Sequence, residues 1–204
     1  MMSKEPAPAA RAAPPTDDGR RRALLEAAIG VFMRFGYRKT SMDEVARTAQ
    51  ISRQGLYLHF STKEDLFRSA VEHVLKTALK ATGAAFRNPE LDLPARLGRA
   101  FDLWVGRYAG MMGEGASDLA QAMGNLVGPL YARYEGAFVD SVAKAMTAGG
   151  LVAPYRAVGL SARNLAETLY ATARGLKYSS PSPEAFSRSM SLAIRALCAP
   201  LGAR

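Results

Sequence analysis

The sequence predicts an all-α protein of about nine helices, and three observations support this fold class. Apolar residues recur at helical spacing through most of the 204 residues, and no segment alternates polar and apolar residues over a useful length. Residues with good capping side chains, such as Ser41, Ser52 and Ser61, precede new apolar periods. Prolines and glycines divide the chain into blocks, as expected between helices.

The first predicted helix begins at Asp18, after a segment with no apolar period. Residues 1–17 are rich in alanine and proline, which is typical of a disordered tail. Gly36 suits a left-handed helix end. Between these points the apolar residues form one helical stripe, made of Leu24, Ala28, Val31 and Phe35.

Two short helices are predicted next, one behind Ser41 and one from Ser52 to His59, with a break at Gln50-Ile51. Ser41 and Glu44 have the spacing of a capping box. A second box at 61–64 opens a long helix that continues to about 82. Helices as short as these two are marginal alone, so we interpret them as a helix-turn-helix braced by the longer helices on either side.

The charge distribution agrees with this interpretation. The chain has 27 basic and 18 acidic residues, a net charge of +9 and a pI near 9.9. Residues 20–59 hold eight basic and three acidic residues, so about a fifth of the chain carries over half of the net charge. Such a surface suits the phosphates of double-stranded DNA.

The second short helix carries side chains that recognise bases. Arg53 can pair with guanine and Gln54 with adenine, and both stand where a recognition helix begins. Gly55 fits close approach to DNA, or is a tolerated helix glycine. Lys63 lies in the first turn of the next helix, where a phosphate would offset its unfavourable position. The residues expected to contact DNA are Arg38, Thr40, Ser41, Ser52, Arg53, Gln54, Gly55, Tyr57, His59 and Lys63.

Several short patterns in this region carry a family resemblance together. They are AxxxFxxxGYxxTS (28–41), DEVA (43–46), ISRQGLYLHF (51–60) and KEDLF (63–67). With them, residues 21–67 resemble the DNA-binding domain of the TetR/AcrR family of bacterial transcription regulators, over about a quarter of the chain. One position departs from the pattern, because Gln50 stands where the family usually has glycine. A left-handed Gln50 would cost roughly 1 kcal/mol.

The resemblance implies a domain organisation and a mode of action. Residues 18–66 would form the helix-turn-helix domain, and residues 83–204 a helical domain for ligand binding and dimerisation. Family members act as homodimers on palindromic operators, most repress, and a small molecule releases them. We expect the same of this chain. The alternative is an architectural regulator, or one controlled by a protein partner.

The C-terminal part contains two sets of residues with an expected role. Helical blocks are predicted near 92–112, 117–126, 129–148, 160–178 and 183–198. The aromatic and methionine side chains expected to line a ligand pocket, or else to form plain core, are Phe101, Trp104, Tyr108, Met112, Met123, Tyr131, Tyr134 and Phe138. The residues expected to form the dimer interface, or else a core hairpin, are Leu165, Leu169, Leu176, Phe186, Met190 and Leu197.

Other classes of protein find little support. No stretch approaches the roughly 18 uninterrupted apolar residues that a membrane span needs. The N-terminus lacks the apolar segment of a secretory signal, so a cytoplasmic location is expected. Cys198 is the one cysteine, and His59 and His73 are too far apart for a metal-binding pair on one helix face. Without a phosphate-binding loop or a nucleophile motif, we expect no cofactor, no metal, no membrane partner and no enzymatic activity.

Overall fold

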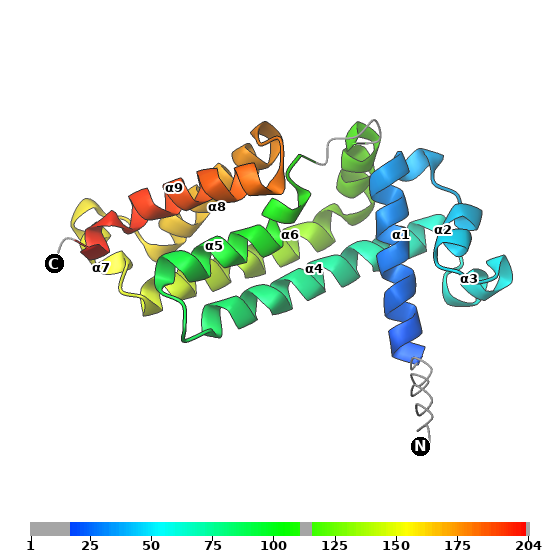
Figure 1. The fold of residues 1–204 in the computed structure, drawn as a ribbon, viewed down its shortest axis with the longest axis horizontal. Coiled ribbons are helices and arrows are strands. Elements are labelled where there is room, and N and C mark those ends of the chain that lie inside the picture. Colours follow the sequence, from blue (N-terminus) through cyan, green and yellow to red (C-terminus); the bar gives the residue numbers. More distant parts are fainter. Residues whose placement is uncertain (1–16, 111–115, 203–204) are drawn as a thin grey trace, which may run out of the picture.

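The computed structural model describes residues 17–110 and 116–202, and every regular element in these ranges is helical (Figure 1). Nine α-helices and two short 3₁₀ turns lie there, which confirms the predicted fold class. They are α1 (Asp17–Lys39), α2 (Met42–Thr48), α3 (Arg53–His59), α4 (Lys63–Arg87), α5 (Leu93–Trp104), η1 (Gly106–Tyr108), α6 (Ala116–Ala148), α7 (Val152–Tyr155), η2 (Arg156–Val158), α8 (Ala162–Ser179) and α9 (Pro183–Gly202).

The helices form an elongated bundle with a small head at one end. Figure 1 shows α4, α5 and α6 running along the molecule, with α8 and α9 beside them at the end away from α3. Helix α1 crosses this bundle and packs against both α4 and α6. The head, formed by α1, α2 and α3, is therefore held directly on the bundle.

A continuous core joins the head and the bundle. In the head, the rings of Phe32 and Phe67 meet edge to face at 4.9 Å between centroids, and both side chains are fully buried. In the bundle, Phe101, Trp104 and Phe138 pack on one another. Burial of these large rings is the main stabilising term of such a core.

Helix boundaries differ from the predicted ones where proline and glycine were expected to end a helix. Helix α6 runs through Pro129, and α4 runs through Gly83 to Arg87 instead of ending near 82. An interior proline loses a hydrogen bond and costs about 3 kcal/mol, but Val127 and Phe138 bury completely on either side of it. Figure 1 shows α6 bent, with its first turns beside α1, as expected of an interior proline.

The start of the chain agrees in part with the prediction. Residues 1–16 of the predicted tail lie outside the described residues, and α1 begins at Asp17. Gly36 has φ 80° and ψ 173°, so it interrupts α1 as expected of a glycine, although a last turn follows as far as Lys39.

The caps of α2 and α4 each differ from the prediction in one respect. Ser41 Oγ accepts the Glu44 N–H at 3.1 Å, but the Glu44 carboxylate pairs with Arg47 instead of completing the box. The cap of α4 is one residue later than predicted, because Thr62 Oγ1 accepts the Asp65 N–H at 3.0 Å.

The apolar stripes predicted to form a dimer interface face inward. Leu165, Leu169, Phe186 and Met190 are at most 3% exposed in the single chain. Leu176 and Leu197 are partly buried and pack on the same core. Helix α8 packs on α6, and α9 packs on α5. The prediction is wrong about the face, because side chains already covered by their own bundle have no surface left for a partner.

Two glycines with similar backbone conformations test how closely the chain at Gly110 packs against Pro181. Gly110 and Gly159 have φ of 73° and 74°. A Cβ on Gly110 would lie 2.3 Å from the Pro181 carbonyl oxygen, whereas a Cβ on Gly159 would meet nothing within 4 Å. We expect Gly159→Ala to cost about 1 kcal/mol and Gly110→Ala about 3 kcal/mol, because only the latter adds a steric clash to the backbone strain. Urea unfolding followed by circular dichroism measures both, and equal losses would contradict the close packing.

Candidate nucleic-acid interface

Helix α3 has one buried face and one exposed face. Leu56 is completely buried and anchors the helix, and Phe60 buries just after it. Arg53, Gln54 and Tyr57 are exposed on the other side. The helix-turn-helix therefore presents polar and cationic side chains at the N-terminal end of its second helix, where such motifs contact base edges.

The turn between α2 and α3 depends on a strained glutamine. Gln50 has φ 57°, the left-handed conformation considered for it from the sequence. Its N–H donates to the Arg47 carbonyl at 3.1 Å, and the Ile51 N–H donates to the Ala46 carbonyl at 3.0 Å. These are the two bonds of a Schellman motif, in which glycine is usual at this position. The chain thus keeps the turn at the cost of backbone strain at Gln50.

The predicted cap of α3 is present. Ser52 Oγ accepts the Gly55 N–H at 2.9 Å, which satisfies one free donor of the helix start. A Cβ on Gly55 would lie 3.1 Å from that same oxygen. Gly55 therefore has a structural role, because a larger side chain would crowd the cap.

Arg53 is held in place before any DNA is bound. Its Nη1 lies 3.1 Å from Asp43 Oδ2, and its guanidinium lies 5.7 Å from the ring centroid of Tyr57, one turn further along α3. The side chain remains 65% exposed. A carboxylate from α2 and a ring from α3 therefore orient this arginine toward solvent while leaving its outer edge free.

Lys63 has a different role from the predicted one. Its ammonium donates to the carbonyls of Tyr37 at 3.0 Å and Thr40 at 3.1 Å, and it lies 4.5 Å from the Tyr37 ring centroid. Burial, and then the charge of Glu64, raise the pKa of the Tyr37 phenol, which stays neutral. The cation thus caps the end of α1, where helix carbonyls favour positive charge.

Thr40 is likewise a structural residue. It is 2% exposed, and its hydroxyl donates to the Gly36 carbonyl at 2.6 Å. The expectation that this hydroxyl contacts phosphate is not met, because both the proton and the surface are already used inside the protein.

Arg38 connects the head to the bundle. Its backbone N–H donates to Asp118 Oδ2 at 2.7 Å, and its guanidinium donates to Gln121 at 2.9 Å. The Arg38 side chain is nonetheless 75% exposed. It can therefore hold the start of α6 and still offer a positive edge to solvent.

Both acids of α2 form ion pairs with arginines, whereas most basic residues of α1 have no acidic partner among the described residues. Asp43 pairs with Arg53, and Glu44 pairs with Arg47. Five basic side chains of α1 have no acidic partner among the described residues, namely Arg20, Arg21, Arg22, Arg34 and Lys39. The excess of positive charge near α3 is therefore real after ion pairing is counted.

Leu58 is a surface residue that the sequence analysis did not single out. It is 82% exposed on α3, between the exposed residues Tyr57 and His59. A helical projection would have found it, because Leu58 lies off the face that buries Leu56 and Phe60. An exposed leucine on a helix of this kind suits contact with a thymine methyl or a sugar.

The residues predicted to line a pocket pack mainly on one another. Trp104 stacks on Phe138 at 4.8 Å between centroids, and Phe101 meets Phe138 edge to face at 5.2 Å. Tyr134 donates to Glu72 of α4 at 3.3 Å. Tyr108, Met123 and Tyr131 are half-buried at the edge of this core, and Met112 lies outside the described residues.

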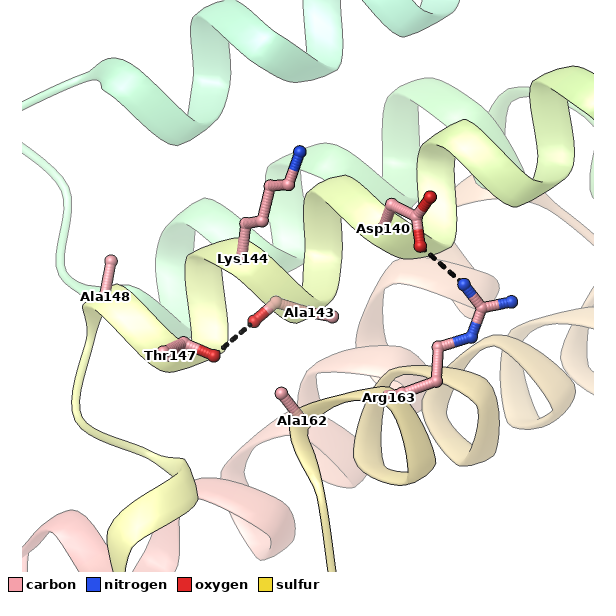
Figure 2. A pocket seen from close by; sticks show the side chains of 7 residues that line it. All are labelled: Asp140, Ala143, Lys144, Thr147, Ala148, Ala162 and Arg163. Carbon is pink, nitrogen blue, oxygen red and sulfur yellow. Dashed lines mark hydrogen bonds and ion pairs between the residues drawn. The ribbon is translucent and has the colours of Figure 1, made fainter.

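Two hollows lie between α6 and α8 instead. The larger, of about 470 Å³, is shown in Figure 2. There the Arg163 side chain from α8 reaches up to Asp140 of α6, with 2.5 Å between Nη1 and Oδ1. Arg163 also lines the smaller hollow, of about 310 Å³, which is otherwise formed by Ala132, Glu135, Gly136, Val139, Glu167, Tyr170, Ala171 and Arg174.

The described ranges contain neither a metal-binding cluster nor a membrane-spanning helix. There, no three of the side chains His, Cys, Asp and Glu gather in a group that could hold a metal ion. Within the same ranges, no helix combines the length and the apolar character that crossing a membrane requires.

The head of the molecule is similar to a known family of proteins. Residues 24–70 match the model described as "Bacterial regulatory proteins, tetR family". The chain is 41% identical over 63 residues to the uncharacterized HTH-type transcriptional regulator YfiR of Bacillus subtilis, and the match covers 31% of each protein. The matched segment is thus about a third of this relative.

Solved structures extend the likeness to the whole fold. A TetR-like transcriptional regulator from Rhodococcus is 22% identical with a TM-score of 0.60, and the match covers 93% of this chain and 99% of that one. The regulator FadR of Bacillus subtilis, solved with stearoyl-CoA, is 14% identical with a TM-score of 0.63, over 85% of this chain and 97% of that one. Residues 24–70 thus match the tetR family of bacterial regulatory proteins, and the fold of the chain resembles that of a TetR-like regulator. These proteins are named as regulators and not as enzymes.

Because Gln50 is strained, we expect that replacing it with glycine stabilises the folded protein. We expect Gln50→Gly to stabilise the protein by about 0.5–1 kcal/mol, because glycine adopts the left-handed conformation without penalty. Gln54→Gly is the matched control, since Gln54 lies inside α3, where glycine destabilises a helix by about 0.5–1 kcal/mol. Chemical denaturation of both variants should show opposite signs. A loss of stability in Gln50→Gly would show that the turn does not strain the glutamine.

The bonds of Lys63 predict a loss of stability. We expect Lys63→Ala to destabilise the protein by about 1–2 kcal/mol, because it removes charged hydrogen bonds to the end of α1 and a cation–π contact. Lys39→Ala is the control, because that exposed side chain should change stability by less than about 0.5 kcal/mol. Thermal and urea unfolding measure both. If Lys63→Ala and Lys39→Ala have the same stability, the contacts of Lys63 with the end of α1 do not stabilise the protein.

Proposed function

We propose that the chain is a sequence-specific DNA-binding regulator whose helix α3 enters the major groove. The observation that carries this proposal is the exposed start of α3, where Arg53 and Gln54 stand on a helix anchored by the buried Leu56. Arginine pairs with guanine and glutamine with adenine through two hydrogen bonds each. The preorganised Arg53 gives one such contact at a low entropic cost.

The phosphate contacts follow from the same geometry. Ser41, Ser52 and Gly55 lie at helix starts, where hydroxyls and backbone N–H groups meet phosphates. Tyr57 and His59 extend the contact along α3, and the unpaired arginines of α1 supply charge beside it. Arg38 adds its exposed edge, whereas Thr40 and Lys63 act by holding the head together.

A homodimer is part of the proposal, but on a different surface from the predicted stripes. The outward faces of α8 and α9 carry exposed apolar side chains, with Tyr178 64% and Leu192 59% exposed. A two-fold dimer through these faces would place two α3 helices on successive turns of DNA, about 34 Å apart. The expected operator is therefore a palindrome.

We further propose repression released by a small molecule. A repressor occupies its operator until a ligand favours a spacing of the two heads that no longer fits the DNA. A bundle that binds an effector is compatible with the fold, since FadR of Bacillus subtilis has been solved with stearoyl-CoA. The hollows between α6 and α8 are the places where such a molecule would fit.

Selection of random DNA duplexes by the purified full-length protein, at one stated salt concentration, tests the proposal. We expect an enriched palindrome with half-sites about one helical turn apart. Salt-dependent binding without any enriched motif would overturn sequence-specific regulation. It would favour an architectural protein held by phosphates alone.

Arg53→Ala tests the recognition helix itself. We expect it to relax the preference at one base pair by about 1–3 kcal/mol, because it removes a bidentate contact to guanine. Arg87→Ala is the matched control, since that exposed arginine lies at the far end of α4. Binding to single-base variants of the selected operator measures the effect. A uniform loss over all bases would assign Arg53 to phosphate instead.

A further inference from the structure

Two cationic side chains of α8, one on the wall of the smaller α6–α8 hollow and one a turn further along the helix, form no ion pair among the described residues. Arg174 lines the hollow, and Lys177 lies one turn further along the helix. Neither forms an ion pair with any described residue. Burial, and then the charge of Arg174, lower the pKa of Lys177. The fold thus brings together two positive charges that an anion would stabilise.

Tyrosine rings surround this ammonium. Lys177 Nζ lies 5.9 Å from the ring centroid of Tyr108 in η1 and 5.6 Å from that of Tyr178. The Arg107 guanidinium also lies near the Tyr108 ring, 5.4 Å from its centroid. The rings keep Lys177 half-buried and partly shielded from water, which strengthens any charge pairing that it makes.

A pair of phenols adjoins the cations. The hydroxyls of Tyr131 and Tyr170 are 3.3 Å apart, and Tyr170 lines the hollow. Burial raises the pKa of both phenols, so both stay protonated. When one hydroxyl donates to the other, one proton is left over, and it can be donated to an anion.

Small side chains form part of the wall of the hollow. Ala132, Gly136 and Val139 form one stripe along α6, and Ala171 faces them from α8. The stripe spans about 10 Å of helix. Its volume of about 310 Å³ is at the lower end of the range for small-molecule sites. Small side chains on facing helices thus leave room for a slender molecule.

The charge of the hollow is uneven along its length. At one end Arg163 is neutralised, because it pairs with Asp140 at 2.5 Å (Figure 2) and also with Glu167 at 2.6 Å. Glu135 is the acid on the wall that has no ion pair among the described residues. Against it stand Arg174 and Lys177, so the end next to η1 keeps an excess of positive charge.

We propose that this hollow binds the regulator's effector, and that the effector is a slender apolar molecule ending in a carboxylate. The carboxylate lies between Arg174 and Lys177. It accepts a hydrogen bond from whichever tyrosine hydroxyl does not donate to the other. The apolar chain lies along the α6 stripe against Ala171. The assignment of this molecule as an effector rests on the proposed function, whereas the site itself rests on the contacts above.

Helix α6 connects this site to the head. The same helix that forms the wall of the hollow holds Arg38 through Asp118 and Gln121. A molecule wedged between α6 and α8 therefore acts on a helix that touches the proposed DNA contacts.

Calorimetric titration of the full-length protein with octanoate tests the site, with octanol as the uncharged probe of the same chain length. We expect octanoate to bind at least about tenfold more tightly than octanol, because only octanoate pairs with the cations. Lys177→Gln and Arg174→Gln should each weaken octanoate binding about tenfold, and Lys177→Arg should retain it. Arg99→Gln, at an exposed arginine of α5, should leave it unchanged.

The outcomes separate this site from the proposed function. Equal affinities for octanoate and octanol, absent octanoate binding, or binding unchanged by both glutamine variants would overturn the carboxylate site. A change of oligomeric state in the variants without octanoate binding would also overturn it, and would assign the hollow to a second copy of the chain. Operator selection is performed without octanoate, so an enriched palindrome stands whatever the titration shows.

Discussion

The ammonium of Lys63 joins the start of α4 to the end of α1, and the position of the recognition helix depends on that junction. It donates to the Tyr37 carbonyl in the last turn of α1 and to the Thr40 carbonyl just after that helix. It also lies over the Tyr37 ring, which meets Phe67 at 5.1 Å. Helices α2 and α3 are too short to be stable alone and are braced between these two long helices. Loss of the junction would therefore loosen α3 without touching any residue on its exposed face.

Helix α6 joins the head to the rest of the bundle. It packs against α1, α4 and α8, and it contributes Phe138 to the aromatic core and one wall of the smaller hollow. Arg38 ties its first turn to the head. Because one bent helix shares these contacts, the DNA-binding end and the α6–α8 hollow belong to one continuous packing arrangement. A regulator that answers to a ligand requires such a connection.

The helix-turn-helix could be predicted from the sequence because its signals are local. Cap side chains, a glycine and the break at Gln50 act over a few residues. The structure confirms the cap at Ser52, and it gives Gln50 the left-handed conformation that the sequence had left open. The roles of Lys63 and Thr40 could not be predicted in this way. Their partners lie on the end of α1, and only the folded chain brings the Lys63 ammonium within 3.0 Å of the Tyr37 carbonyl.

In the C-terminal part, sequence patterns could not predict which surfaces the apolar stripes pack against. An apolar stripe shows that a helix face is buried, but not whether its own bundle or another chain buries it, so Leu165 and Phe186 were assigned to the wrong contact. The sequence by itself determined the all-α class, the position of the recognition helix and the basic surface beside it, because periodicity, caps and charge are properties of neighbouring residues. Tertiary structure decided which stripes form the core, that Pro129 bends α6 instead of ending it, and that Lys177 of α8 meets the Tyr108 ring of η1, because these depend on packing between residues far apart in the sequence.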